Sequence, residues 1–366
     1  MAKSPLLIRG MHGMGDNIHQ RALLRQLLPD YEIWLKTSWA CIYHDLIDQG
    51  LHLIREKVNL RTQTKNAERE AAKFEGLPSE VRSAPPLQVM YHGFNVQRQP
   101  SRTILSAMLE SAHMGLRFEG ADYRLPIPEA WQAEADAIIA EWAPTKPLLI
   151  YRPLSARPEW QGGAMRNADA GVYTKLFATI RDSFFVVSLA DLDQQREWYL
   201  GPQLRADVDI RDGRYPFETI AGLFKRAALV YTSSGFGAVL APAVETPVIS
   251  IVGGYERAQW HLDQNWSPAL GIEPINPCAC AVSTCGRRCN KETDMNTATA
   301  RIREFVEKLG ISTPAESRPF SEIYGPEVGR DGGPAIIQRH HTGAAPAHSR
   351  PIANQRQVLR HLGLKV

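Results

Sequence analysis

Residues 227–254 read AALVYTSSGFGAVLAPAVETPVISIVGG and form the longest weakly charged stretch of the chain. A stretch this long and apolar could be mistaken for a membrane span. Pro242, Glu245, Pro247 and four glycines argue against a single helix. Two runs rich in β-branched residues flank a turn of small residues, which is the pattern of a strand, a helix and a second strand. The stretch therefore predicts a soluble α/β protein.

The same alternation of strand-like and helix-like segments continues on both sides of this stretch. Strands are predicted over 6–9, 32–37, 87–91, 148–151, 184–189, 208–211, 229–232 and 248–252. Helices are predicted over 17–28, 42–56, 102–114, 131–142, 172–181, 216–226 and 297–308, with a short one from 236. Residues 57–86 read as polar and irregular. Alternation of this kind predicts parallel, doubly wound sheets.

The segment APTKP at 143–147 interrupts the alternation, which then begins again. Two sets of alternating elements predict two Rossmann-like domains that face a cleft, one over 1–144 and the other over 145–310. Residues 311–366 are rich in Pro, Gly, His and Arg, and only 354–362 look helical again. We expect this tail to pack across the domains or to be partly mobile.

Charge and cysteine content narrow the class of protein. The 42 Lys and Arg residues against 39 Asp and Glu give a net charge of +3, which fits an anionic ligand better than a nucleic-acid surface. Cys41 stands alone, while Cys278, Cys280, Cys285 and Cys289 lie close together and could form a small structural zinc site. Free thiols, or disulfides formed on oxidation, are the alternatives. No secretory signal is visible, so a reducing cytoplasm is expected.

The glycine-rich segment GMHGMGDNIHQ at 10–20 falls between the first predicted strand and the first predicted helix. Asp16 precedes that helix, so it is either the helix N-cap or a carboxylate placed for chemistry. The glycine spacing is not the dinucleotide fingerprint, and no Walker lysine is present. Ligands of open α/β sheets bind beyond the carboxyl ends of strands. Asp16 could therefore be a general base, with His12 and His19 as orienting groups, although His19 could equally be a surface histidine.

Two segments of the second half have the character of phosphate sites. Arg152 and Arg157 lie in the loop that follows the strand at 148–151, where guanidinium groups suit a phosphate, although surface ion pairs are the simpler explanation. Where the strand at 229–232 gives way to a helix, free N–H groups and the helix dipole could bind a diphosphate. A serine N-cap with glycine packing is the alternative there. The residues of this turn are Ser233, Ser234, Gly235, Phe236 and Gly237.

Two further turns follow predicted strands. His92 and Asn95 come after the strand at 87–91, and Gly254 comes after the strand at 248–252. Each of these turns could line the cleft or be a plain connection.

Taken in order, these segments resemble the heptosyltransferase-like glycosyltransferases of family 9, which have the GT-B fold. The Gly-Asp turn of that family, with a histidine three residues after the aspartate, is similar to residues 14–19. Its basic residue before a tryptophan is similar to residues 157–160, and its donor turn to 233–238 with 241–248. Several members carry a cysteine cluster, as this chain does. Where the family has an aspartate and a histidine in the donor turn, this chain has Ser233 and Ala238.

The resemblance implies an inverting glycosyl transfer from a nucleotide-diphosphate sugar without a catalytic metal. Asp16 would then be the base and His19 its partner in catalysis, with His12, Gly13, Gly15, His92 and Asn95 on the side of the acceptor. Arg152, Arg157, the turn at 233–237 and Gly254 would hold the donor. The acceptor domain would be 1–144 and the donor domain 145–310. The two departures in the donor turn imply that the nucleotide or the sugar differs from ADP-heptose.

Several questions of function stay open at the level of sequence. The acceptor implied by the family is a glycan of the lipopolysaccharide-core kind, and a modified DNA base is an alternative. A cytoplasmic location, at most peripheral to the inner membrane face, is expected. A GT-B-type sugar-nucleotide epimerase would share the donor site, and so would a non-catalytic nucleotide-sugar binding protein. Oligomeric state is not predicted.

Overall fold

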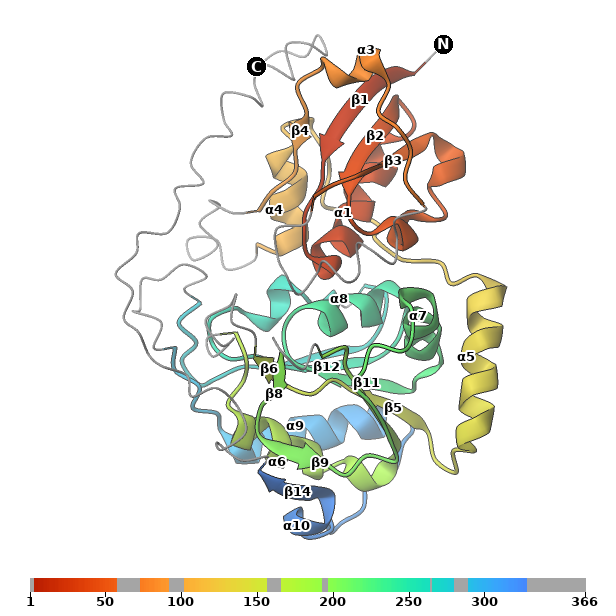
Figure 1. Cartoon of the computed structure of the whole chain (residues 1–366). Coiled ribbons are helices and arrows are strands. Elements are labelled where there is room, and N and C mark those ends of the chain that lie inside the picture. Colours follow the sequence, from red (N-terminus) through yellow and green to blue (C-terminus); the bar gives the residue numbers. More distant parts are fainter. Residues whose placement is uncertain are drawn as a thin grey trace. The chain divides into compact units, whose positions relative to one another are not determined.

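The computed structural model describes residues 3–57, 73–91, 102–156, 166–192, 197–263, 265–279 and 289–327. Two compact units divide the chain between Leu125 and Pro126 (Figure 1). Unit 1 holds 3–125 of the described residues and unit 2 holds 126–327. The assignment of the acceptor to one domain and the donor to the other stays a prediction.

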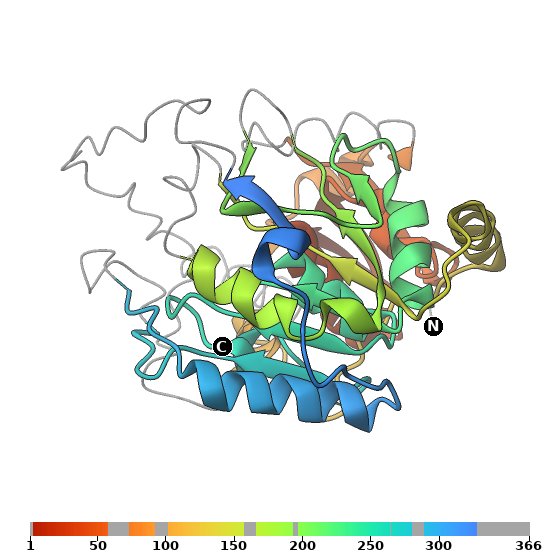
Figure 2. The same cartoon turned by 90° about the horizontal axis from the view of Figure 1, so that it is seen from below.

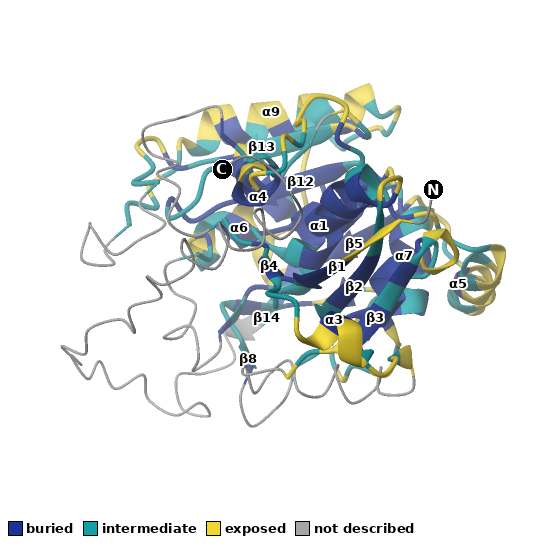
Figure 3. Ribbon diagram, turned by 90° about the horizontal axis from the view of Figure 1, so that it is seen from above, coloured by how far each residue is buried: buried dark blue, intermediate teal, exposed yellow. Residues whose placement is uncertain are grey.

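Within the described part of unit 1, four parallel strands form a sheet in the order β3-β2-β1-β4. Its strands are β1 (Ser4–Arg9), β2 (Tyr31–Thr37), β3 (Leu51–Arg55) and β4 (Leu87–Gln88). Its helices are α1 (Met14–Leu27), α3 (Ser79–Arg82) and α4 (Ile104–Ser111), with single 3-10 turns at η1 (Ala40–Tyr43) and η2 (Ile47–Gln49). The central residues of β1 and β2 are buried, as Figure 3 shows, because the sheet forms the core of this unit.

The predicted helix over 42–56 is wrong. Two short 3-10 turns occupy the first part, and β3 occupies the last part. Gly50 separates them with a φ of 100°, a conformation that L side chains rarely adopt and that ends the helical turn. Leu51 and Leu53 are buried while His52 is only partly buried, which is the period of a strand. The segment pairs in parallel with β2 from Ile33 to Thr37.

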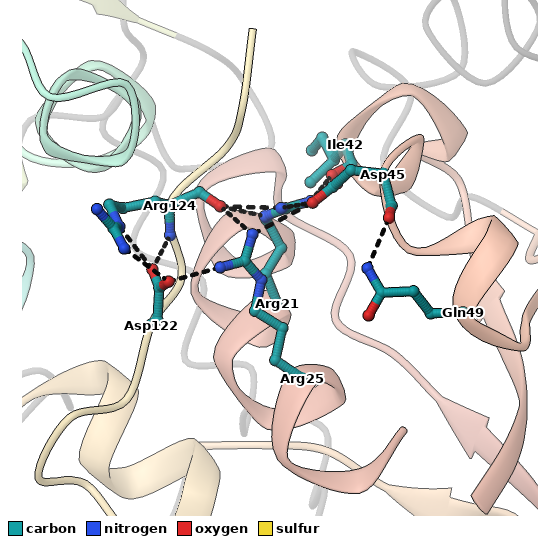
Figure 4. Close-up of polar contacts among 7 residues, drawn as sticks. All are labelled: Arg21, Arg25, Ile42, Asp45, Gln49, Asp122 and Arg124. Carbon is teal, nitrogen blue, oxygen red and sulfur yellow. Dashed lines mark hydrogen bonds and ion pairs between the residues drawn. The ribbon is translucent and has the colours of Figure 1, made fainter. Parts of the chain in front are cut away.

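A network of charged side chains ties the end of unit 1 to α1 (Figure 4). The guanidinium of Arg21 is fully buried and reaches the Asp45 carboxylate through contacts of 2.8 and 2.7 Å. It also donates to the Ile42 carbonyl and, at 2.8 and 3.0 Å, to the Arg124 carbonyl. Arg25 donates to the same carbonyl of Arg124 and to the Asp122 carboxylate. The chain therefore leaves unit 1 from a point that is fixed to α1.

Unit 2 contains, among its described residues, a sheet of six parallel strands in the order β10-β7-β5-β11-β12-β13. These strands are β5 (Leu148–Tyr151), β7 (Phe185–Leu189), β10 (Val208–Ile210), β11 (Leu229–Thr232), β12 (Val248–Ile251) and β13 (Ala269–Ile272). Antiparallel pairs join β6 (Ser155–Ala156) to β8 (Trp198–Tyr199) and β9 (Pro202–Leu204) to β14 (Tyr324–Glu327).

Helices of unit 2 lie on both faces of its sheet. The described helices of this unit are α5 (Glu129–Trp142), α6 (Ala170–Ala178), α7 (Phe217–Arg226), α8 (Phe236–Ala243), α9 (Met295–Lys308) and α10 (Phe320–Ile323), with 3-10 turns at η5 (Arg181–Ser183) and η6 (Ala258–Trp260). Helix α8 lies on one face of the sheet, and α6 and α9 lie on the other, as Figure 1 shows. Leu229 and Tyr231 share a core with α6, α9 and α10. Helices α6 and α9 also lie near one another in Figure 2. Doubly wound packing of this kind explains why β11 is buried along its whole length.

Helix α5 packs on α7 within unit 2. Gly222 of α7 allows the close approach, since a Cβ there would lie 2.5 Å from the Trp131 carbonyl. Thr219 donates to Glu134, and Arg226 pairs with Asp136. The segment 131–142, which we expected before the domain boundary, therefore belongs to unit 2. Residues 311–327 of the expected tail also lie in unit 2, and the last eight of them form α10 and β14. Residues 328–366 lie outside the described residues, and so does the predicted helix at 354–362.

Candidate functional site

Each sheet has a point at which the direction of its winding reverses. In unit 2 the chain proceeds from β5 toward β7 and β10, then returns to place β11 on the other side of β5. In unit 1 the chain proceeds from β1 toward β2 and β3 and later returns to place β4 beside β1. Ligands of open α/β sheets bind beyond the carboxyl ends of the two strands at such a point. The turns after β1, β5 and β11 are therefore the candidate sites.

Asp16 lies in the first turn of α1, at its third residue, and is not the N-cap. Gly13 occupies the cap position, and no side chain caps the helix there. The interpretation of Asp16 as the N-cap is therefore wrong. The Asp16 carboxylate instead lies against Gly13, where a Cβ would be 2.5 Å from Oδ2. A carboxylate in a first helical turn interacts favourably with the helix dipole.

The buried amide of Asn17 holds the turn that leads to Asp16. Its Nδ2 donates to the carbonyls of Met11 and Gly13, both at 2.8 Å. Its Oδ1 accepts from Thr37 Oγ1 at 2.8 Å, and the Tyr43 hydroxyl lies 2.8 Å from the same oxygen. Side chains from β2 and η1 thereby fix the loop from the side of the core. We did not predict this role for Asn17.

A second buried amide fixes the start of the same loop. Gln20 Oε1 accepts from the Met11 N–H at 3.0 Å, and Nε2 donates to the Tyr43 hydroxyl at 2.9 Å. Gly10 leaves room for this amide, because a Cβ there would lie 3.0 Å from its terminal atoms. The turn after β1 is consequently held at both ends by side chains of the helix that follows it.

The two predicted histidines occupy different environments. His19 is buried and packs edge-to-face on Tyr123, with ring centroids 5.1 Å apart. The carbonyl of His12 accepts from Trp39 Nε1 at 2.8 Å. Burial lowers the pKa of His12, opposed by Glu56 and aided by Arg9. The roles of Asp16, His19, His12, Gly13 and Gly15 stay predictions, and His92 and Asn95 lie outside the described residues.

Arg152 lies at the reversal point of unit 2, directly after β5. Its N–H donates to the Tyr231 carbonyl at 2.9 Å, so the ends of β5 and β11 are joined. Nη1 donates to the Leu189 carbonyl at 2.7 Å, and the guanidinium carbon lies 5.5 Å from the Phe236 ring centroid. The Tyr173 hydroxyl donates to the Arg152 carbonyl at 2.6 Å. This arginine is therefore held close to the first residue of α8.

The turn between β11 and α8 is built for a close approach of the backbone. Gly235 caps α8 with φ 111° and ψ −143°, a conformation that favours glycine, and no side chain caps the helix. The hydroxyl oxygens of Ser233 and Ser234 are buried and make no hydrogen bond to a described residue. A Cβ at Gly237 would lie 2.7 Å from Thr232 Oγ1. The first N–H groups of α8 and two hydroxyls thus gather where an anion could bind.

Sequence reasoning missed three residues beside this turn, which are Arg166, Glu256 and His261. Arg166 and His261 both contact the Glu256 carboxylate. The turn 253–256 was identified as a candidate for the cleft, but neither the glutamate nor its partners stood out. Gly254 has a φ of 79°, and a Cβ there would lie 2.3 Å from the Asn290 carbonyl. Its donor role stays a prediction, as do those of Arg152 and of the turn at 233–237.

Other predicted residues lie at or beyond the edge of the described chain. Arg157 and the rest of the segment 157–160 are outside the described residues, and so are Cys280 and Cys285. Cys278 and Cys289 are half-buried. The structural zinc site stays a prediction. In the described part of the chain, none of the helices combines the length and the apolar character needed to cross a membrane.

No family model matches the chain, and no curated protein sequence matches it. A solved glycosyl transferase family 9 structure from Veillonella parvula matches with a TM-score of 0.53 at 13% identity, over 84% of this chain and 97% of that one. The ADP-heptose lipopolysaccharide heptosyltransferase II of E. coli matches at 14% identity with a TM-score of 0.49, over 83% of this chain and 98% of the other. The likeness to the Veillonella structure confirms the expected GT-B fold with two Rossmann-like units.

Proposed function

We propose that the chain is a glycosyltransferase that moves a sugar from a nucleotide-diphosphate sugar to an acceptor hydroxyl. The observation that carries the proposal is the reversal point of unit 2. There Arg152, the buried hydroxyls of Ser233 and Ser234, and the first N–H groups of α8 lie together. Each of these groups can stabilise a diphosphate, because helix N-termini and guanidinium groups both favour anions.

The reaction follows from assigning a base to unit 1 and a leaving-group site to unit 2. Asp16 takes the proton of the acceptor hydroxyl, whose oxygen then attacks the anomeric carbon of the donor sugar. The bond from that carbon to the diphosphate oxygen breaks, and the nucleoside diphosphate leaves with the electron pair. Attack opposite the leaving group inverts the anomeric centre. Negative charge grows on the diphosphate in the transition state, where Arg152 and the α8 N-terminus stabilise it.

The family resemblance suggests which donors to try first. The E. coli relative is named for ADP-heptose, so ADP and its sugar conjugates are the first candidates. Ser233 and Ala238 stand where the family has an aspartate and a histidine, so a donor with another base or sugar is tested beside it. For the acceptor, a glycan of the lipopolysaccharide-core kind is the first choice.

A thermal-shift screen tests the proposal. The full chain is heated with ADP, UDP, GDP and CDP, with sugar conjugates of each, and with the matching nucleosides as controls. A ligand at about one hundred times its Kd adds roughly 2.7 kcal/mol of stability. We expect one diphosphate series to raise the Tm and its nucleoside to leave it unchanged. If none raises the Tm, the proposal fails.

Product analysis then separates the enzyme classes. The donor that binds is incubated with the chain, first alone and then with acceptor glycans, and the products are identified by mass spectrometry. Release of nucleoside diphosphate together with a glycosylated acceptor supports transfer. A changed sugar nucleotide formed from donor alone would instead identify an epimerase.

A further inference from the structure

Arg166, Glu256 and His261 form a chain of contacts beside the turn that precedes α8. Arg166 meets the Glu256 carboxylate along one edge, with Nε 3.1 Å from Oε1 and Nη2 3.2 Å from Oε2. His261 Nε2 lies 2.9 Å from Glu256 Oε2. The side chain of His261 is only 5% exposed and that of Glu256 12%. Burial alone would raise the pKa of Glu256, but Arg166 and His261 lower it well below its usual range.

The position of Arg166 connects this chain of contacts to the proposed donor site. A Cβ built on Gly235 would have Arg166 Nη2 as its nearest neighbour, at 3.9 Å. Near the same turn, a Cβ built on Gly237 would lie 3.3 Å from Arg152 Cγ. The guanidinium carbon of Arg152 lies 5.5 Å from the ring centroid of Phe236, so two guanidinium groups lie near the start of α8. Ser233, between β11 and this turn, is 8% exposed, and its hydroxyl has no hydrogen-bond partner among the described residues.

We propose that Arg166 is a diphosphate-binding cation of the donor site, and that Glu256 and His261 are positioning residues that hold it there. The inference rests on the proposed function. A guanidinium that is already fixed along one edge loses less conformational freedom when it binds an anion. The Glu256 carboxylate binds and fixes one edge of the Arg166 guanidinium, and His261 in turn holds Glu256 in place. Arg166, which lies outside every motif of the sequence, thus adds a second positive charge to that of Arg152 near the N-terminus of α8.

Binding measurements on the full chain test the role of Arg166. ADP, UDP, GDP and CDP are titrated by calorimetry, and the tightest binder and its nucleoside are used for the variants. Loss of a charged hydrogen-bond donor predicts that Arg166→Ala weakens binding of the diphosphate about ten- to a hundredfold. Binding of the nucleoside should not change. Arg166→Lys keeps the positive charge but lacks the planar set of N–H donors of a guanidinium, so it should recover part of the affinity.

Arg226→Ala is the matched control. Arg226 also meets a carboxylate along one edge, with two contacts of 2.7 Å to Asp136, but it precedes β11 at the amino ends of the strands. We expect this variant to bind the diphosphate with an unchanged Kd. An equal loss of affinity in Arg226→Ala would show that any broken ion pair of unit 2 has the same effect, and would overturn the assignment.

A double-mutant cycle tests whether Glu256 acts through Arg166. Glu256→Ala should weaken binding of the diphosphate in the wild-type background. In the Arg166→Ala background it should have no further effect on the Kd. A loss of stability alone would lower the Tm without this dependence on Arg166, so both Kd and Tm are measured. If Glu256→Ala costs the same affinity in both backgrounds, the positioning role is wrong.

The outcomes distinguish this inference from the proposed function. A wild-type chain that binds none of the four diphosphates overturns both. A wild-type chain that binds one of them with the same Kd as Arg166→Ala overturns only the role of Arg166. If Arg166→Ala does not fold, Arg166→Gln replaces it, and an unchanged Kd in that neutral variant overturns the role of Arg166.

Discussion

The carboxylate of Asp16 lies directly against the backbone of Gly13, so that a Cβ on residue 13 would be 2.5 Å from Asp16 Oδ2. Gly13 has φ −73° and ψ 143°, which any residue can adopt. Gly13→Ala should therefore leave the backbone unstrained and displace only the carboxylate. If Asp16 is the base, we expect transfer to fall about a hundredfold, because a displacement of about 1 Å can cost that much. The rate of transfer and the Tm are the measurements.

Gly76→Ala is the control for this variant. Gly76 has no heavy atom within 4 Å of a built Cβ, so the methyl group enters open space in the same unit. Both variants should keep their stability within about 1 kcal/mol. Full activity of Gly13→Ala would contradict the assignment of Asp16, whereas inactivity of Gly76→Ala would point to a general sensitivity of the unit.

Asp16→Asn separates chemistry from helix stabilisation. Asp16 is the third residue of α1, where a carboxylate contributes about 0.3–1 kcal/mol through the helix dipole. We therefore expect the variant to lose no more than about 1 kcal/mol of stability, measured by urea denaturation, and to lose transfer. Asp48→Asn, at an exposed site of unit 1, is the matched control and should keep its activity. If Asp16→Asn were active, the role of Asp16 would be limited to its interaction with the dipole of α1.

The sequence predicted several strands well where an apolar run was short, whereas β4 ends at Gln88, three residues before the predicted end at 91. The bounds of β5 and β11 were predicted to the residue, because each is a continuous buried run of four residues. The segment 42–56 failed because its apolar residues are compatible with both a helical and a strand period. What decides there is the free edge of β2, with which β3 pairs. Pairing between distant segments is not visible in a local pattern.

The residues of the candidate sites also fall into those predictable from a local pattern and those that depend on distant segments. The glycines and the aspartate of residues 10–16 lie together in the chain, so their turn could be predicted. Asn17 is fixed by Thr37 and Tyr43, which are 20 and 26 residues away. Glu256 lies 90 residues after Arg166. Such partners meet only through the order of the strands, which places the ends of β5, β11 and β12 side by side.

Replacement of Asn17 should test whether the turn is held from the core. Asn17→Ala leaves the Met11 carbonyl and the Thr37 hydroxyl without this partner inside the protein, and each such group costs about 1–3 kcal/mol. We expect a loss of about 3 kcal/mol in urea denaturation and reduced transfer. Asn17→Asp should not rescue it, since a carboxylate cannot donate to two carbonyls. Asn296→Ala, at an exposed site, should cost less than about 0.5 kcal/mol.

Neutralisation of Asp45 should destabilise unit 1 strongly. Asp45 provides both carboxylate oxygens to Arg21, whose side chain is fully buried. Asp45→Asn leaves that guanidinium without its counter-charge, and breaking a buried pair costs about 3–5 kcal/mol. Asp136→Asn breaks the exposed pair with Arg226 and should cost at most about 1 kcal/mol. Similar losses in the two variants, measured by urea denaturation, would contradict the buried role of Arg21.

The pH dependence of stability should report the burial of His12. Burial lowers the pKa of this imidazole, with Glu56 opposing the shift and Arg9 adding to it, so the folded state keeps the ring neutral where the unfolded chain takes up a proton. The stabilising contribution is complete above the unfolded pKa of 6.5 and is lost as the pH falls through the folded value. As the pH falls below 7, the free energy of unfolding should therefore decrease less in His12→Asn than in the wild type. His113→Asn, at an exposed site, should follow the wild-type curve. If His12→Asn also follows it, the half-buried ring of His12 does not contribute to the acid sensitivity of the fold.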